Sequence, residues 1–141
     1  MKNITASGII IFRNEGNIPL FLGLKALPKF RKKSNGIYDV PKGRLEPEET
    51  PIDAAYRECL EESGIIPIKI IAGPFIDDQL AMWLGETDEV LVTIGKNPES
   101  GIVEHEGYKW LQTKDLEKKC LNYLRPSIKW AHNKVWEYLR I

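Results

Sequence analysis

Apolar residues gather along the chain in short runs separated by turn-forming residues, a pattern that predicts β-strands. The run at 7–13 is apolar and rich in isoleucine, which favours a buried strand. Residues 14–17, Asn-Glu-Gly-Asn, supply a turn, so the run at 19–25 is expected to pair with the first as a hairpin. Further strands are expected at 37–40, 68–72, 89–94 and 107–111.

Three other segments carry the spacing and end signals of helices. Thr50 can cap a helix that starts at Pro51, and Gly64 can end it in the left-handed conformation. Apolar residues recur at helical spacing over 126–139, and a shorter helix is expected at 113–120. Strands and helices that alternate without a linker between them predict an α/β fold with a mixed sheet.

Composition limits the class of protein. The chain has 141 residues, 43% hydrophobic and 28% charged, as expected for one globular domain over residues 1–141. No apolar run approaches the roughly 20 residues of a membrane span, and no secretory signal follows Met1, so we expect a cytoplasmic protein without a membrane partner. Cys59 and Cys120 are the only cysteines, which excludes a disulfide scaffold and a multi-cysteine zinc site.

The charges are balanced in number but not in position. Twenty basic and twenty acidic residues exclude a generally basic nucleic-acid coat protein. Residues 1–44 carry nine Lys or Arg against two acids, whereas residues 45–62 carry seven acids against one arginine. A basic arm followed by an acidic segment suits a polyanion that is handled together with metal cations. Charge alone leaves open that both segments are simply solvated faces.

The predicted helix after Thr50 carries three glutamates on one face. Glu58, Glu61 and Glu62 stand at i, i+3 and i+4, so their carboxylates lie close together. Like charges so spaced destabilise a helix by roughly 0.2–0.5 kcal/mol per pair. Mg²⁺ or Mn²⁺, which prefer oxygen ligands, would compensate this repulsion. The helix alone leaves open a solvated acidic stripe, partly offset by Arg57.

A longer motif surrounds these glutamates. Gly43 is followed after five residues by Glu49, after seven more by Arg57-Glu58, and then by Cys59-Leu60-Glu61-Glu62-Ser63-Gly64-Ile65. This string resembles the Nudix box, Gly-x5-Glu-x7-Arg-Glu-U-x-Glu-Glu-x-Gly-U with U apolar, and it matches every fixed position over residues 43–65. The resemblance identifies a Nudix hydrolase. It implies a Nudix-type α/β/α sandwich, with a mixed β-sheet between helices and the box forming loop–helix–loop.

The resemblance also implies a chemistry and roles for the residues of the box. Nudix hydrolases cleave a nucleoside diphosphate linked to another group, using Mg²⁺ or Mn²⁺. Glu61 would be a metal ligand, or would orient and deprotonate the attacking water. Arg57 and Glu49 would be a supporting pair that ties the loop to the helix. The further metal ligands would be two helix carboxylates and one backbone carbonyl, those of Glu58, Glu62 and Gly43.

Two stretches outside the box indicate a branch of the family. Residues 38–43, Tyr-Asp-Val-Pro-Lys-Gly, resemble the entry to the box in diadenosine polyphosphate hydrolases. Residues 104–111, Glu-His-Glu-Gly-Tyr-Lys-Trp-Leu, resemble a stretch of the asymmetric diadenosine tetraphosphate hydrolases. By that resemblance Glu104 is the loop glutamate that reaches the metal, and Tyr108 is a candidate to stack on adenine. Packing of Tyr108 in the core is the alternative.

Four basic side chains are candidates to bind phosphate. Lys42 and Arg44 flank Gly43, next to the predicted metal site. Lys32 and Lys33 belong to a basic loop at 25–33, which would either contact the outer phosphates of a long polyphosphate or remain solvated.

The expected activity is metal-dependent hydrolysis of a small nucleoside polyphosphate, with diadenosine tetraphosphate cleaved to ATP and AMP as the favoured reaction. Relatives that act on 5′-triphosphorylated RNA, nucleotide sugars or diphosphoinositol phosphates remain alternatives. A non-catalytic Nudix-fold module that binds RNA or a nucleotide is a third. It is disfavoured because such modules often lose carboxylates of the box, and none is missing here.

Overall fold

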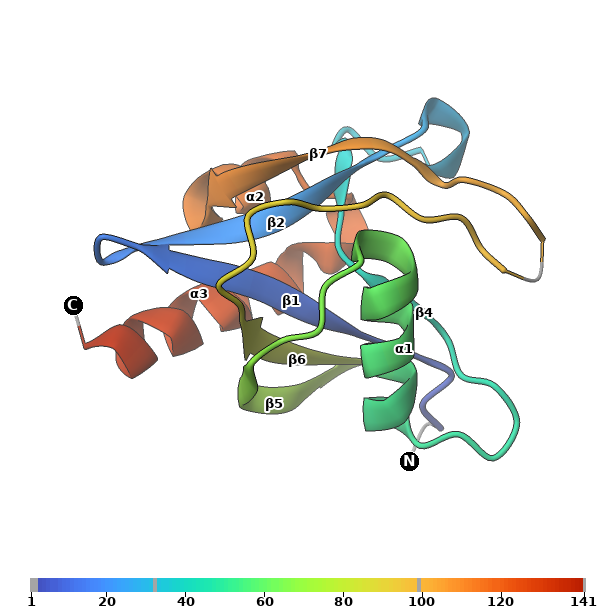
Figure 1. Ribbon diagram of the computed structural model, residues 1–141, viewed down its shortest axis with the longest axis horizontal. Coiled ribbons are helices and arrows are strands. Elements are labelled where there is room, and N and C mark those ends of the chain that lie inside the picture. Colours follow the sequence, from blue (N-terminus) through green and yellow to red (C-terminus); the bar gives the residue numbers. More distant parts are fainter. Residues whose placement is uncertain (1–2, 32, 99, 141) are drawn as a thin grey trace.

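The computed structural model describes residues 3–31, 33–98 and 100–140, and within them seven strands form one sheet. The strand order is β3-β2-β1-β6-β5, with β4 paired to β1 and β7 paired to β2 (Figure 1). The strands are β1 (Ala6–Glu15), β2 (Ile18–Ala26), β3 (Tyr38–Asp39), β4 (Lys42–Arg44), β5 (Lys69–Asp77), β6 (Leu80–Glu86) and β7 (His105–Gln112).

β1 is the centre of this sheet, and its neighbours make the sheet mixed. It pairs antiparallel with β2 and β4 but parallel with β6, where Ala6 stands opposite Leu80. Successive side chains of a strand point to opposite faces. Ile9 and Ile11 accordingly enter one hydrophobic cluster, and Ile10 and Phe12 enter the other. Both faces of β1 are therefore covered.

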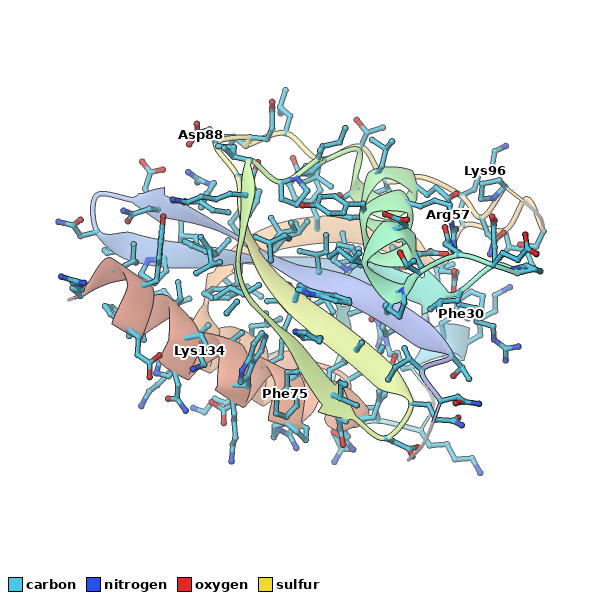
Figure 2. The ribbon with its side chains drawn as sticks, turned by 90° about the horizontal axis from the view of Figure 1, so that it is seen from below. Phe30, Arg57, Phe75, Asp88, Lys96 and Lys134 are labelled. Carbon is cyan, nitrogen blue, oxygen red and sulfur yellow. The ribbon has the colours of Figure 1, made fainter. Side chains whose placement is uncertain are left out.

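Helices cover the two faces of the sheet. On one face α1 (Pro51–Ser63) packs through Ala55 and Cys59. On the other face lie α2 (Thr113–Lys119) and α3 (Arg125–Leu139). Phe75 of β5, labelled in Figure 2, stacks on Trp130 of α3, and the ring centroids are 5.4 Å apart. The predicted α/β/α sandwich is confirmed. No helix in the described ranges is long and apolar enough to cross a membrane.

Most predicted elements are present. The strands at 7–13 and 19–25 form the β1–β2 hairpin, whose turn places Gly16 and Asn17 at positive φ. The three predicted helices are α1, α2 and α3, each within one residue of its expected bounds. The basic loop contains the 3₁₀ turn η1 (Pro28–Phe30), and a second 3₁₀ turn, η2 (Asn122–Leu124), links α2 to α3.

The strand predicted at 89–94 is wrong. This segment is irregular and lies against the C-terminal end of α1, where the N–H of Thr93 donates to the carbonyl of Ser63 at 2.9 Å. Its alternating pattern arises because Val92 and Ile94 pack on the α1-side core while Leu91 is exposed. The strand that pairs in parallel with β1 is β6 instead, which the sequence reading missed.

Candidate active site

The ends of α1 are fixed by the residues that predicted them. Thr50 accepts a hydrogen bond on its side chain from the N–H of Asp53 at 3.3 Å, and Pro51 occupies the first turn. Gly64 adopts φ 74°, and its N–H donates to the carbonyl of Leu60. With Ala55 and Cys59 buried, the opposite face of the helix is directed away from the core.

A pocket of about 720 Å³ lies along the charged side of α1 that carries Arg57, Glu58, Glu61 and Glu62. The rest of its described wall comes from residues 5–6, β4 and residues 45–47 after it, the β5–β6 turn, η2, and Asn97, Pro98 and Glu104. Among its lining residues are eight that the sequence singled out, Lys42, Gly43, Arg44, Arg57, Glu58, Glu61, Glu62 and Glu104. The structure therefore brings a cluster of carboxylates and several cations into one cavity.

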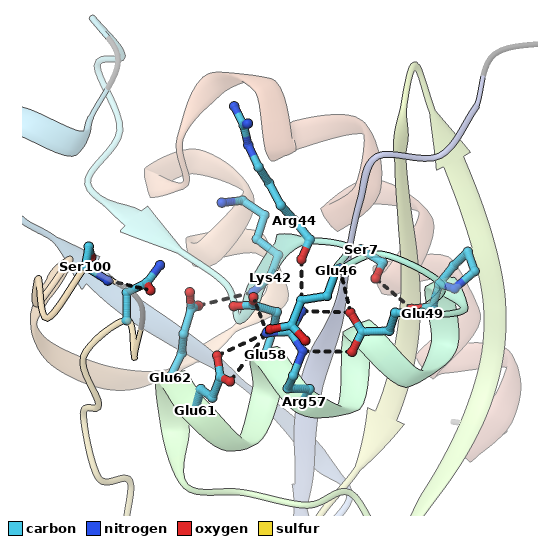
Figure 3. A network of polar contacts seen from close by, with 12 residues as sticks. Ser7, Lys42, Arg44, Glu46, Glu49, Arg57, Glu58, Glu61, Glu62 and Ser100 are labelled. Carbon is cyan, nitrogen blue, oxygen red and sulfur yellow. Dashed lines mark hydrogen bonds and ion pairs between the residues drawn. The ribbon is translucent and has the colours of Figure 1, made fainter.

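Arg57 is the centre of the polar network in this pocket (Figure 3). Its guanidinium donates to both carboxylate oxygens of Glu49, at 2.8 and 2.9 Å. The same group donates to Glu58 at 2.9 Å, to Glu61 at 3.2 Å, and to the backbone carbonyl of Arg44 at 2.9 Å. The hydrogen bond from Arg57 lowers the pKa of Glu49. The structure thus joins β4, the following loop and α1 through one side chain.

Gly43 lets β4 approach α1 closely. A Cβ built on Gly43 would lie 2.2 Å from Cδ of Glu58 and within 2.4 Å of both carboxylate oxygens. Real Cβ atoms do not tolerate such contacts, so any side chain here would push the strand and the glutamate apart. The backbone of Gly43 and the Glu58 carboxylate therefore share a space that only glycine leaves open.

Burial and neighbouring carboxylates make the charged forms of two helix glutamates unfavourable. Burial raises the pKa of Glu58 against the opposing effect of Arg57, and the like charges of Glu61 and Glu104 raise it further. Burial also raises the pKa of Glu62, and nearby carboxylates add to that shift. The N–H of Lys42 donates to Glu62 Oε1 at 3.2 Å. Buried oxygen donors that repel one another are the donor set that a hard divalent cation favours.

These side chains are partnered by the protein itself in the conformation described. Arg57 holds Glu58 and Glu61, and in the part of the chain that the structure describes no three acidic, histidine or cysteine side chains are grouped tightly enough to hold one ion. The donor chemistry fits Mg²⁺ or Mn²⁺, and binding would require these carboxylates to turn from arginine to the ion.

Two of the predicted substrate contacts, Tyr108 and Lys33, do not line the pocket as the structure describes it, and a third lies outside the described residues. Tyr108 is 38% exposed on β7, and it is absent from the pocket wall as far as the structure describes it. Lys33 is exposed in the basic loop and is also absent from that wall. Lys32 lies outside the described residues. The roles of these three residues stay predictions.

The ammonium of Lys42 is turned to a partner that the sequence reading did not single out. Its Nζ lies 3.1 Å from Oδ1 of the buried Asp39 and 5.3 Å from the centre of the Tyr123 ring. Tyr123 lines the pocket, 81 residues after Lys42 in the chain. No local pattern marks Tyr123, because only the packing of η2 beside β3 and β4 brings it here.

Comparisons with known proteins agree with this geometry. The family model described as NUDIX domain matches residues 2–131. An RNA pyrophosphohydrolase of Bartonella tribocorum is 26% identical over 140 residues, which cover 82% of this chain and 80% of that protein.

Two solved structures share the fold. A C. elegans Ap4A hydrolase binary complex has a TM-score of 0.69 at 22% identity, covering 97% of this chain and 98% of that one. The NUDIX domain of Shewanella oneidensis NrtR complexed with ADP ribose has a TM-score of 0.65 at 13% identity, covering 99% and 90%. At these identities the likeness shows the fold alone.

Proposed function

Since the chain belongs to the NUDIX domain family, and is therefore a Nudix hydrolase, we propose that it cleaves diadenosine tetraphosphate to ATP and AMP. The observation that carries the proposal is the pocket in which Glu58, Glu61, Glu62 and Glu104 face the cations Arg44 and Arg57. A polyphosphate chain needs both kinds of group, since its own charge repels a nucleophile and its leaving group must accept more charge.

Each of these residues would have a separate role in the reaction. Glu58 and Glu62 would hold Mg²⁺ or Mn²⁺, with the carbonyl of Gly43 and with Glu61 or Glu104 as further ligands. When bound, the ion supplies charge neutralisation at the phosphate oxygens and makes water easier to deprotonate. Arg44, whose side chain is exposed at the pocket, is placed to bind a phosphate.

Hydrolysis transfers one proton and breaks one bond. The oxygen of water attacks a phosphorus atom, Glu61 accepts the proton of that water, and the anhydride P–O bond breaks. The electron pair of the broken bond leaves with the departing phosphate. Arg57 donates to Glu49 and to the carbonyl of Arg44, so it acts on this step by holding β4 and the following loop against the helix that carries the acceptor carboxylate.

A 5′-triphosphorylated RNA is the second candidate substrate. The observation that favours it is the Bartonella tribocorum relative, an RNA pyrophosphohydrolase that aligns over most of both chains. Both substrates present a polyphosphate next to a nucleoside, so the pocket chemistry is the same. What differs is the group beyond the phosphates.

A hydrolysis panel tests the proposal. Diadenosine tetraphosphate, ADP-ribose, nucleotide sugars, diphosphoinositol phosphate and triphosphorylated RNA are each incubated with the protein and Mg²⁺ or Mn²⁺. We expect the highest kcat/KM for diadenosine tetraphosphate, complete loss of turnover in excess EDTA, and loss of several orders of magnitude in Glu62→Gln. The Gln side chain can still accept the Lys42 N–H, so the fold should persist. Turnover in EDTA, or a Glu62→Gln variant as active as wild type, would refute the metal-dependent assignment.

A further inference from the structure

A buried acid connects segments that lie far apart in the sequence. Asp39 of β3 is 8% exposed, and its Oδ2 lies 3.0 Å from Nε2 of His105, 66 residues later. Its Oδ1 lies 3.1 Å from Nζ of Lys42 and accepts the N–H of Val40 at 2.8 Å. The carboxylate thus contacts β7 and the start of β4 at once.

Each partner of Asp39 is next to a residue of the pocket. Lys42 precedes Gly43, and its N–H donates to Glu62 of α1. His105 follows Glu104, which lines the pocket and faces the helix glutamates. Through two contacts, Asp39 therefore reaches every segment that supplies a candidate metal ligand.

His105 depends on this contact for its orientation. The ring is 2% exposed, and its Nδ1 has no hydrogen-bond partner among the described residues, so Nε2 makes the hydrogen bond that fixes the ring. The ring also lines a small cavity of about 10 Å³ whose other walls include Glu58, Glu61 and Glu104. A rotation of the imidazole would therefore disturb the space between the loop glutamate and the helix.

The contacts of Asp39 act against repulsion between carboxylates of the pocket. Glu104 and Glu58 line the same two cavities, so their like charges oppose the approach of the segment before β7 to α1. Burial would raise the pKa of Asp39, but Lys42 and His105 outweigh it and hold the pKa at about 2. Asp39 is thus an anion at neutral pH, able to hold a cation and an imidazole against that repulsion.

We propose that Asp39 is a positioning residue for hydrolysis, which acts through His105 and Lys42 to hold Glu104 and Glu62 in one pocket. The inference rests on the proposed function, because it assumes that these glutamates carry the reaction. Residues that orient metal ligands in this way typically change metal affinity or activity by about 10–100-fold when they are replaced.

Matched variants separate positioning from mere stability. His105→Phe keeps a planar ring but removes the contact with Asp39, whereas His105→Gln restores an N–H near the position of Nε2. Asp39→Asn weakens the same contact from the other side. The control is His132→Phe, since His132 Nδ1 lies 2.7 Å from the hydroxyl of Thr113 on the α3 side of the sheet, away from the pocket.

The measurements are Tm, kcat and KM for diadenosine tetraphosphate, and Mn²⁺ affinity by electron paramagnetic resonance without substrate. We expect His105→Phe and Asp39→Asn to lose about tenfold or more in kcat and in Mn²⁺ affinity, with KM within about threefold of wild type. His105→Gln should recover most of both. His132→Phe should lower Tm without changing kcat or Mn²⁺ affinity.

Wild-type kcat and Mn²⁺ affinity in His105→Phe would overturn the inference, and so would an equal loss in His132→Phe. A wild-type protein that neither binds Mn²⁺ nor cleaves any substrate of the panel would overturn the proposed function, and this inference with it.

Discussion

Arg57 donates from Nε and Nη2 to the two carboxylate oxygens of Glu49, eight residues earlier in the chain. Nη2 also donates to the carbonyl of Arg44 at the end of β4. The segment between β4 and α1 is therefore held at both ends by one guanidinium, which keeps Gly43 against the helix glutamates.

Loss of this guanidinium should reduce both stability and rate. Arg57→Ala leaves the half-buried Glu49 without its charged donor, so we expect the free energy of unfolding to fall by ~2 kcal/mol and kcat to fall with it. Arg125→Ala is the control, because Arg125 donates to the carbonyl of Glu117 beside α3 and does not line the pocket. It should lower stability alone. Denaturant unfolding and steady-state kinetics give both quantities, and an Arg57→Ala protein with unchanged Tm and turnover would refute the role of the pair.

The close approach at Gly43 makes a second prediction. In Gly43→Ala the new Cβ would overlap the Glu58 carboxylate, so we expect a loss of ~1–3 kcal/mol in stability and a large fall in kcat. Gly107→Ala is the matched control, because a Cβ there meets no atom within 4 Å. The Tm from thermal melts and the kcat of the two variants are compared with those of the wild type. Equal behaviour of both would show that the contact between β4 and α1 is unimportant.

The ends of α1 and the grouping of the helix carboxylates could be predicted because their signals are local. Thr50, Pro51 and Gly64 act within one helical turn, and Glu58 and Glu62 share a face by helix geometry alone. β6 could not be recognised in the same way. Buried on both faces beside β1, it has no alternation of polar residues, and its alanine, methionine and leucine favour a helix as readily as a strand.

The buried thiols should be unreactive in the folded protein. Burial raises the pKa of Cys59 to about 12 and that of Cys120 to about 11. A raised thiol pKa keeps the proton on sulfur to higher pH, so at pH 8 almost no thiolate is present, whereas an unfolded cysteine with a pKa of about 8.5 is partly ionised. Ellman's reagent should label neither cysteine in buffer at pH 8 and both in denaturant. Rapid labelling of the folded protein would contradict this.

The basic loop provides a prediction from the sequence that the pocket geometry leaves open. If Lys32 and Lys33 contact the outer phosphates, Lys32→Gln with Lys33→Gln should raise KM for diadenosine tetraphosphate more than it lowers kcat, because an exposed charge contributes mostly uniform binding. Lys118→Gln with Lys119→Gln, two exposed lysines on α2, is the control for net charge. An unchanged KM, or equal changes in both double variants, would show that the loop is simply solvated.

Long-range contacts explain what the sequence reading missed in the site. Asp39 and His105 are separated by 66 residues, and nothing near either residue marks them as partners. Tyr123 reaches the pocket because the N–H of Leu121 donates to the carbonyl of Tyr38 at 2.8 Å, which brings η2 beside β3. Such contacts follow from the packing of the whole sheet.

The most direct test is the position of cleavage in diadenosine tetraphosphate. The substrate is hydrolysed in ¹⁸O-labelled water with Mg²⁺ or Mn²⁺. The products are then separated, and their masses are measured by mass spectrometry. We predict ATP and AMP, with one ¹⁸O atom in only one of the two products, because a single water attacks one phosphorus atom. Formation of two molecules of ADP, or no cleavage of this substrate alongside rapid hydrolysis of another member of the panel, would contradict the account.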